Sequence, residues 1–192
     1  MRRVMVCALW ILLAGCTRGG AQPDTDAIAV ATTSPSSASP TSTLSDTEQV
    51  AAAQATTAYL SLQRAFGEAS KTANYQSADI ARYSGDPARQ QLTRGLYDLA
   101  RQGIVTVIRG PTPTFSPVAT TVSLAMSPPE VTVKDCVDTR SVYFVHKANG
   151  QSAEPTGAPY QPHRRHPATA VVRRYAGRWL VVTLATDQGA TC

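Results

Sequence analysis

Two histidines in this chain have a spacing that could hold a metal ion. His163 and His166 are separated by two residues, so both imidazoles could reach one cation. Arg164 and Arg165 stand between them and oppose cation binding, and no third ligand follows nearby in the sequence. We therefore interpret this segment as a solvated basic loop and predict no metal site.

Two carboxylates could act as a paired acid and base. Asp135 and Asp138 flank Cys136. Aspartates near a strand end also accept hydrogen bonds from the nearby backbone and so cap turns, and we favour that interpretation. The sequence contains no G-x-S-x-G, H-E-x-x-H, P-loop or dinucleotide fingerprint. We predict no catalytic residue and no cofactor.

The third reactive group is the thiol of Cys16, which ends the sequence Leu-Leu-Ala-Gly-Cys. A positive segment with Arg2 and Arg3 comes first, and the apolar residues 4–13 that follow are too few to span a bilayer as a helix. This order is typical of a signal peptide. The small residues before the cysteine resemble the bacterial lipobox, whose cysteine receives a diacylglycerol and becomes the new N-terminus. We predict a lipoprotein signal peptide over residues 1–15 and lipidation of Cys16 with acyl chains such as palmitate.

The location of the protein follows from this anchor. A plain secretory signal or an uncleaved membrane anchor would also fit the first residues, but neither explains the placement of Cys16. Two or three acyl chains give stable anchoring, whereas one gives marginal binding. We expect a protein that is lipid-anchored at the cell membrane, on its extracytoplasmic face.

Residues 16–45 predict a disordered tether after the lipidated cysteine. They are rich in serine, threonine and proline and nearly devoid of large apolar side chains. Such a segment cannot bury enough surface to offset its ordering entropy.

The charge of the chain argues against a nucleic-acid partner. The formal net charge of +5 falls to +3 once Arg2 and Arg3 leave with the signal peptide. A nucleic-acid-binding surface would need a larger, clustered positive charge.

The folded domain is predicted to begin with a long helix. Ser45 and Glu48 have the Ser-x-x-Glu spacing of a capping box. Apolar residues then recur at helical spacing from Val50 to about Ala69.

A second long helix is predicted from Asp86 to Gly103. Asp86 is a favourable N-cap, Pro87 suits the first helical position, and Gly103 supplies the C-terminal stop. A short helical turn over residues 77–83 lies between the two long helices.

From Ile104 onward the apolar period changes to two, which is typical of strands. The predicted strands are residues 104–109, 118–126, 130–137, 141–147, 168–175 and 178–186. Ala176 and Gly177 form a two-residue hairpin link between the last two strands. Helices followed by strands indicate an α+β domain over residues 46–192, with N-terminal helices packed on a curved antiparallel sheet.

This order of elements resembles the NTF2-like cone fold, and the sequence is similar to a group of lipoproteins and secreted proteins of actinobacteria. The residues that carry the resemblance are Ala81, Arg82, Tyr83, Ser84, Gly95, Leu96, Arg101, Gly103, Val105, Val131, Val133, Asp135, Cys136, Asp138, Val172, Arg173, Arg174, Trp179, Gly189, Thr191 and Cys192. The resemblance covers residues 46–192 and implies a cone-shaped α+β domain.

The remaining cysteines predict a disulfide independently of the resemblance. Cys7 leaves with the signal peptide and Cys16 is acylated, so Cys136 and Cys192 remain in an oxidising compartment. Their spacing differs from the C-x-x-C of redox-active pairs. We expect a structural bond between them.

Three classes of function remain open. The leading one is a non-catalytic ligand-binding or scaffolding domain, because cone-shaped folds commonly hold a small apolar ligand or a partner peptide. The second is an enzyme of the isomerase or cyclase kind, and the candidate pocket-lining residues are Tyr59, Asp79, Tyr83 and Tyr97. The third is an assembly subunit of an envelope or export complex, whose apolar final strand packs against an envelope protein or a second copy in a homodimer.

Overall fold

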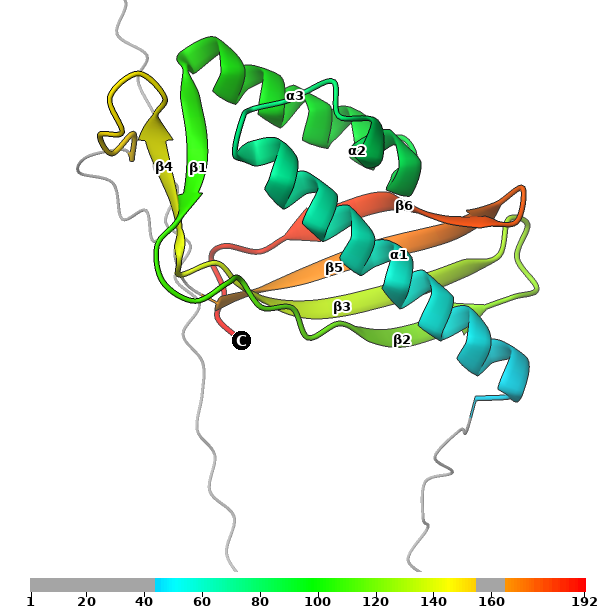
Figure 1. Cartoon of the computed structure of the whole chain (residues 1–192). Coiled ribbons are helices and arrows are strands. Elements are labelled where there is room, and N and C mark those ends of the chain that lie inside the picture. Colours follow the sequence, from blue (N-terminus) through cyan, green and yellow to red (C-terminus); the bar gives the residue numbers. More distant parts are fainter. Residues whose placement is uncertain (1–43, 155–164) are drawn as a thin grey trace, which may run out of the picture. The chain divides into compact units, whose positions relative to one another are not determined.

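A computed structural model describes residues 44–154 and 165–192, which belong to one compact unit. The predicted signal peptide, Cys16, the tether as far as residue 43, and His163 lie outside the described residues. The described helices are α1 (Asp46–Ser70), α2 (Ala78–Tyr83) and α3 (Ala88–Gln102). The described strands are β1 (Ile104–Ile108), β2 (Val118–Ser123), β3 (Glu130–Asp138), β4 (Val142–His146), β5 (Arg165–Tyr175) and β6 (Arg178–Thr186) (Figure 1).

Helix α1 begins where the capping box predicts. The hydroxyl of Ser45 accepts a hydrogen bond from the backbone amide of Glu48, and the carboxylate of Glu48 accepts one from the amide of Ser45. The buried face differs from the prediction at its N-terminal end, because Val50 is 56% exposed and Ala51 is buried instead. The first turns of α1 therefore pack through small alanine side chains.

Helix α3 starts one residue later than predicted. Pro87 occupies the N-cap position, and the carboxylate of Asp86 accepts two hydrogen bonds from the guanidinium of Arg89, at 2.8 and 3.2 Å. The predicted capping role of Asp86 is wrong, because the ion pair with Arg89 occupies its carboxylate. Gly103 ends the helix as predicted, with a left-handed φ of 65°.

The larger sheet has four antiparallel strands in the order β2-β3-β5-β6. Its central pair sets Val133 of β3 opposite Ala170 of β5. The predicted two-residue link between β5 and β6 is confirmed, with φ of 46° at Ala176 and 80° at Gly177. Two positive φ angles match a hairpin turn whose twist suits the flanking strands.

Strands β1 and β4 form a separate two-stranded sheet, which corrects the expectation of a single sheet. The chain turns sharply after β3, where the carboxylate of Asp138 accepts hydrogen bonds from the backbone amide and the guanidinium of Arg140. This turn directs β4 away from β5 and toward β1. The turn-capping role predicted for Asp138 is confirmed.

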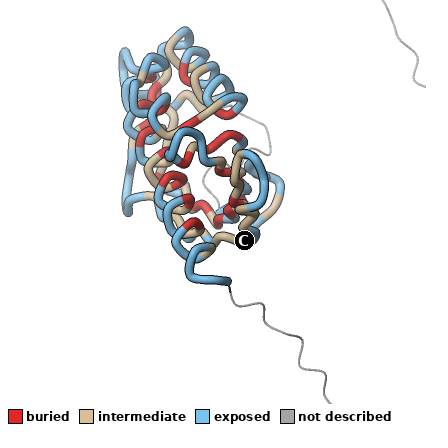
Figure 2. The backbone as a smooth tube through the Cα atoms, turned by 90° about the vertical axis from the view of Figure 1, so that its right-hand side faces the viewer, coloured by how far each residue is buried: buried red, intermediate tan, exposed pale blue. Residues whose placement is uncertain are grey.

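The helices lie on one face of the four-stranded sheet, and α1 crosses all four strands (Figure 1). Buried positions of the backbone gather between α1 and the strands (Figure 2). The fully buried side chains of the main core include Tyr59, Leu62, Ile80, Leu96, Val131, Val133, Val172 and Val181. The predicted α+β fold, with helices on an antiparallel sheet, is confirmed.

Candidate functional site

An open groove of about 540 Å³ is lined by residues of α1, of the C-terminal end of α2 and of the β5–β6 hairpin. We call it the arginine groove, because Arg82, Arg174 and Arg178 all line it. Its volume lies within the range of small-molecule binding sites.

A hydrogen bond between Trp179 and Gln54 holds the two sides of the arginine groove together. Trp179 is 8% exposed, and its indole Nε1 donates to Oε1 of Gln54 at 3.0 Å. An indole N–H can only donate, so it fixes which end of the amide faces it. The Nε2 donor of Gln54 is therefore turned away from Trp179.

The arginine groove is positively charged. The guanidinium of Arg178 donates a hydrogen bond to the backbone carbonyl of Arg82, which ties the hairpin to α2. Asp79 lies 3.8 Å from the guanidinium of Arg82, but both side chains are more than 60% exposed, so water screens this pair. None of the described residues that line the groove is acidic.

A second groove, of about 630 Å³, lies beside α3. We call it the tyrosine groove, because the rings of Tyr75 and Tyr97 meet edge to face there, with centroids 5.3 Å apart. Its one acidic residue, Asp86, is the partner of Arg89 described above. The carboxylate of Asp86 in the tyrosine groove is therefore occupied by Arg89.

The four predicted pocket residues do not converge on one cavity. Tyr59 is fully buried in the core, and Asp79 is 62% exposed and lines neither groove. Tyr83 lines the arginine groove, and Tyr97, which is 44% exposed, lines the tyrosine groove. The expectation that α2 points Asp79 inward is wrong, because α2 turns that position to solvent and presents Ile80 to the core.

Tyr59 and Asp135 form a buried polar contact between α1 and β3. The hydroxyl of Tyr59 donates to Oδ2 of Asp135 at 2.8 Å, and the backbone amide of Ser116 donates to Oδ1 at 2.6 Å. The predicted role of Asp135 as a turn cap is wrong. Asp135 lies within β3, is 6% exposed, and accepts its backbone hydrogen bond from Ser116, which is distant in sequence. The sequence holds the signal for this: Asp135 falls two residues from both Val133 and Val137, on the buried face of β3.

The pKa of Tyr59 is raised far above its ordinary value of 10.0 by burial, and further by its hydrogen bond to the Asp135 carboxylate. A raised folded-state pKa adds stability below the unfolded value, and that stability is lost as the pH rises above about 10. We expect one of the seven tyrosines not to ionise in the native protein at alkaline pH. Absorbance titration of tyrosinate should show the missing ionisation appear only on unfolding, and Tyr59→Phe should remove it. Full ionisation of a native protein would contradict the buried contact.

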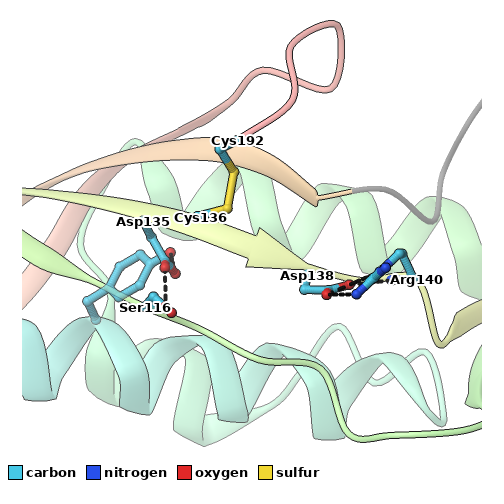
Figure 3. The surroundings of a disulfide bond; sticks show 7 residues. Ser116, Asp135, Cys136, Asp138, Arg140 and Cys192 are labelled. Atoms are coloured by element: carbon cyan, nitrogen blue, oxygen red, sulfur yellow. Dashed lines mark hydrogen bonds and ion pairs between the residues drawn. A yellow bond between two sulfur atoms is a disulfide. The ribbon is translucent and has the colours of Figure 1, made fainter.

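The predicted disulfide between Cys136 and Cys192 is confirmed, with Cα atoms 5.9 Å apart. Asp135 and Cys136 point to opposite faces of β3, and the bond fastens the C-terminal residue to the face away from α1 (Figure 3). The disulfide and the Tyr59 contact thus hold neighbouring residues of one strand from both sides.

His166 does not lie in a solvated loop as predicted. It is 6% exposed, lies on β5 and pairs in register with Val137. In the described part of the chain, no cluster of three or more histidine, cysteine or acidic residues is placed to hold a metal ion.

Within the described residues, no helix has the length and apolar character needed to cross a bilayer.

Comparisons with known proteins concern the fold. No protein-family model and no curated protein matches the chain. The structure is similar to the intermembrane space region of the chloroplast protein ARC6, with a TM-score of 0.44 and 12% identity over 70% of this chain and 95% of that one. It is also similar to a protein of unknown function with a cystatin-like fold from Nostoc punctiforme, with a TM-score of 0.38 and 10% identity over 69% of this chain and 91% of that one.

Proposed function

We propose that this protein is a lipoprotein anchored on the extracytoplasmic face of the cell membrane, and that its domain binds a ligand in the arginine groove without catalysing a reaction. The observation that carries the proposal is the composition of this groove. Hydrogen-bond donors and two aromatic side chains, Tyr83 and Trp179, line it, and none of its described residues is a carboxylate, histidine or cysteine. Arginine stays protonated at physiological pH, so the groove suits binding better than proton transfer.

We also infer an NTF2-like cone for the domain. Its support is the order of elements: two long helices with a short one between, followed by antiparallel strands. In this family a ligand or a partner peptide commonly occupies the open end of the cone.

The alternative of an enzyme would need an acid or base, and among the described residues neither Asp79 nor Asp135 is suitably placed. A catalytic carboxylate needs a cavity and a second polar group that orients it. Asp79 is exposed, and Asp135 is enclosed by Tyr59 and the amide of Ser116. We expect Asp79→Asn to leave ligand binding unchanged.

The alternative function, as an assembly subunit of an envelope or export complex, is suggested by the apolar residues of β6. Val181 and Val182 are buried within the chain, and the carbonyl of Val181 accepts a hydrogen bond from the amide of Gly85. Packing inside the domain thus accounts for these apolar residues.

The lipid anchor predicts the behaviour of a single substitution. We expect Cys16→Ser to shift the protein from the membrane fraction to the uncleaved precursor or the medium, because serine has no thiol to acylate. Fractionation and mass spectrometry of the N-terminal peptide provide the measurement, and Cys7→Ser is the matched control. Normal processing and membrane retention of the Cys16→Ser protein would contradict the anchor.

Native mass spectrometry of protein purified from its own membranes tests the binding function. We expect a small molecule to remain bound, and Trp179→Phe to reduce its occupancy because the substitution removes the indole N–H that anchors Gln54 while it keeps an aromatic ring in the core. Tyr97→Ala in the tyrosine groove is the control and should retain the ligand. Loss of the ligand in the control alone would contradict our choice of groove.

A further inference from the structure

Three arginines from separate elements line the arginine groove. Arg82 comes from the last turn of α2, whereas Arg174 and Arg178 come from the two strands of the β5–β6 hairpin. The hairpin sets Arg174 opposite Trp179 and Tyr175 opposite Arg178, so both arginines flank one tight turn. The hydrogen bond from Arg178 to the carbonyl of Arg82 connects the hairpin to α2.

Some arginines elsewhere on the domain bind carboxylates directly, whereas others, such as Arg64 and Arg94, form no ion pair with a described carboxylate. Arg173, the neighbour of Arg174, contacts Glu130 at 2.8 Å, and Arg140 contacts Asp138 at 2.7 Å. Among the described residues, no carboxylate pairs with Arg174 or Arg178, and these two arginines line the same groove. The third arginine, Arg82, has a carboxylate partner in Asp79, but the two groups are 3.8 Å apart and exposed to water. The groove therefore holds positive charge that the described part of the chain does not neutralise.

We propose that the arginine groove recognises a phosphoryl group, carried either by a lipid headgroup or by a soluble phosphate compound. The inference rests on the proposed function, because it names the ligand class of the same groove. Guanidinium groups present paired donors that match the oxygens of a phosphate. A single carboxylate would leave most of the charge of three arginines unneutralised, whereas a phosphoryl group carries more charge and more acceptor oxygens.

The other lining side chains suit the rest of such a ligand. The amide of Gln54, oriented by Trp179, offers a neutral donor beside the arginines. The aromatic side chains of Tyr83 and Trp179 provide apolar surface for an organic group attached to the phosphate. The groove thus combines an anion site with a wall for a less polar portion.

The test uses the mature lipidated protein in detergent, in which removal of the signal peptide takes Trp10 away and leaves Trp179 as the remaining tryptophan. We expect inorganic pyrophosphate to change the Trp179 emission in a saturable manner, and sodium chloride at equal ionic strength not to do so. The double variant Arg174→Gln/Arg178→Gln should bind at least about tenfold more weakly, because it removes two charged donors of hydrogen bonds to the phosphoryl oxygens. Both arginines are exposed, and an unchanged thermal midpoint would show that the variant is folded.

Arg165→Gln is the matched control, because it removes one charge from the same strand, roughly 30 Å from Arg174 at the rise of an extended chain. It should bind pyrophosphate like the parent. A second arm anchors the protein to phosphatidylcholine vesicles with or without phosphatidic acid. An emission change with phosphatidic acid that the double variant lacks would assign the phosphoryl group to a lipid headgroup, and a response to pyrophosphate alone would assign it to a soluble compound.

The absence of a response in both arms, or equal responses from parent and double variant, would overturn the phosphoryl assignment. The binding function is judged separately by the molecule that copurifies with the protein. A neutral molecule held at Trp179 would leave the proposed function standing while this inference fails. A protein that retains no ligand and responds to no probe would contradict both.

Discussion

Replacing Cys136 and Cys192 together with serine is expected to lower the free energy of unfolding by up to about 4 kcal/mol. The disulfide closes a loop of 56 residues, and the chain-entropy model assigns about this value to a loop of that length. Cys136 is only partly buried, so serine in its place adds little cost of its own. The main effect is therefore the greater freedom of the unfolded chain.

Urea denaturation of the parent and the double serine variant measures this effect. Reduction of the parent should reproduce the loss, and the neighbouring substitution Thr191→Ser should leave stability unchanged. Equal stability of the parent and the double serine variant would show that the disulfide does not constrain the chain as inferred.

The second large effect is expected from Asp135→Ala, at about 3 kcal/mol of lost stability. The substitution leaves the buried hydroxyl of Tyr59 without its acceptor, which costs about 1–3 kcal/mol, and it also removes the acceptor of the Ser116 amide, which is less buried. Asp135→Asn should cost less, because the asparagine oxygen can accept from the amide while the tyrosine hydroxyl turns to accept from the asparagine NH₂.

A double-mutant cycle with Tyr59→Phe isolates this contact. We expect the two substitutions to be non-additive, because each removes one partner of the same hydrogen bond. Thr57→Ala on the exposed side of α1 is the control and should be additive with Asp135→Ala. Additive behaviour of Tyr59→Phe would mean that the two side chains do not interact in solution.

The local elements could be predicted because their signals lie in neighbouring residues. The capping box at Ser45, the stop at Gly103 and the two-residue link at Ala176 depend on a few adjacent residues, and the structure has each of them. The disulfide could be predicted because the sequence leaves few cysteines to choose from. The division into two sheets could not, because it depends on where the chain turns after Asp138.

The site was harder to predict than the fold. The groove residues Gln54, Arg82 and Trp179 are far apart in sequence, and the resemblance that includes Arg82 and Trp179 does not assign them to a common site. Their proximity arises from the packing of α1 and α2 against the β5–β6 hairpin, and a single sequence does not record such long-range contacts. The prediction for Asp79 failed for a related reason, because the spacing of a six-residue helix does not show which face meets the core.

A crystal structure of the protein purified from its membranes tests the central claim most directly. The account predicts density in the arginine groove, in contact with Trp179 and within hydrogen-bond distance of the guanidiniums of Arg174 and Arg178. An empty arginine groove together with a ligand bound in the tyrosine groove or elsewhere would contradict it.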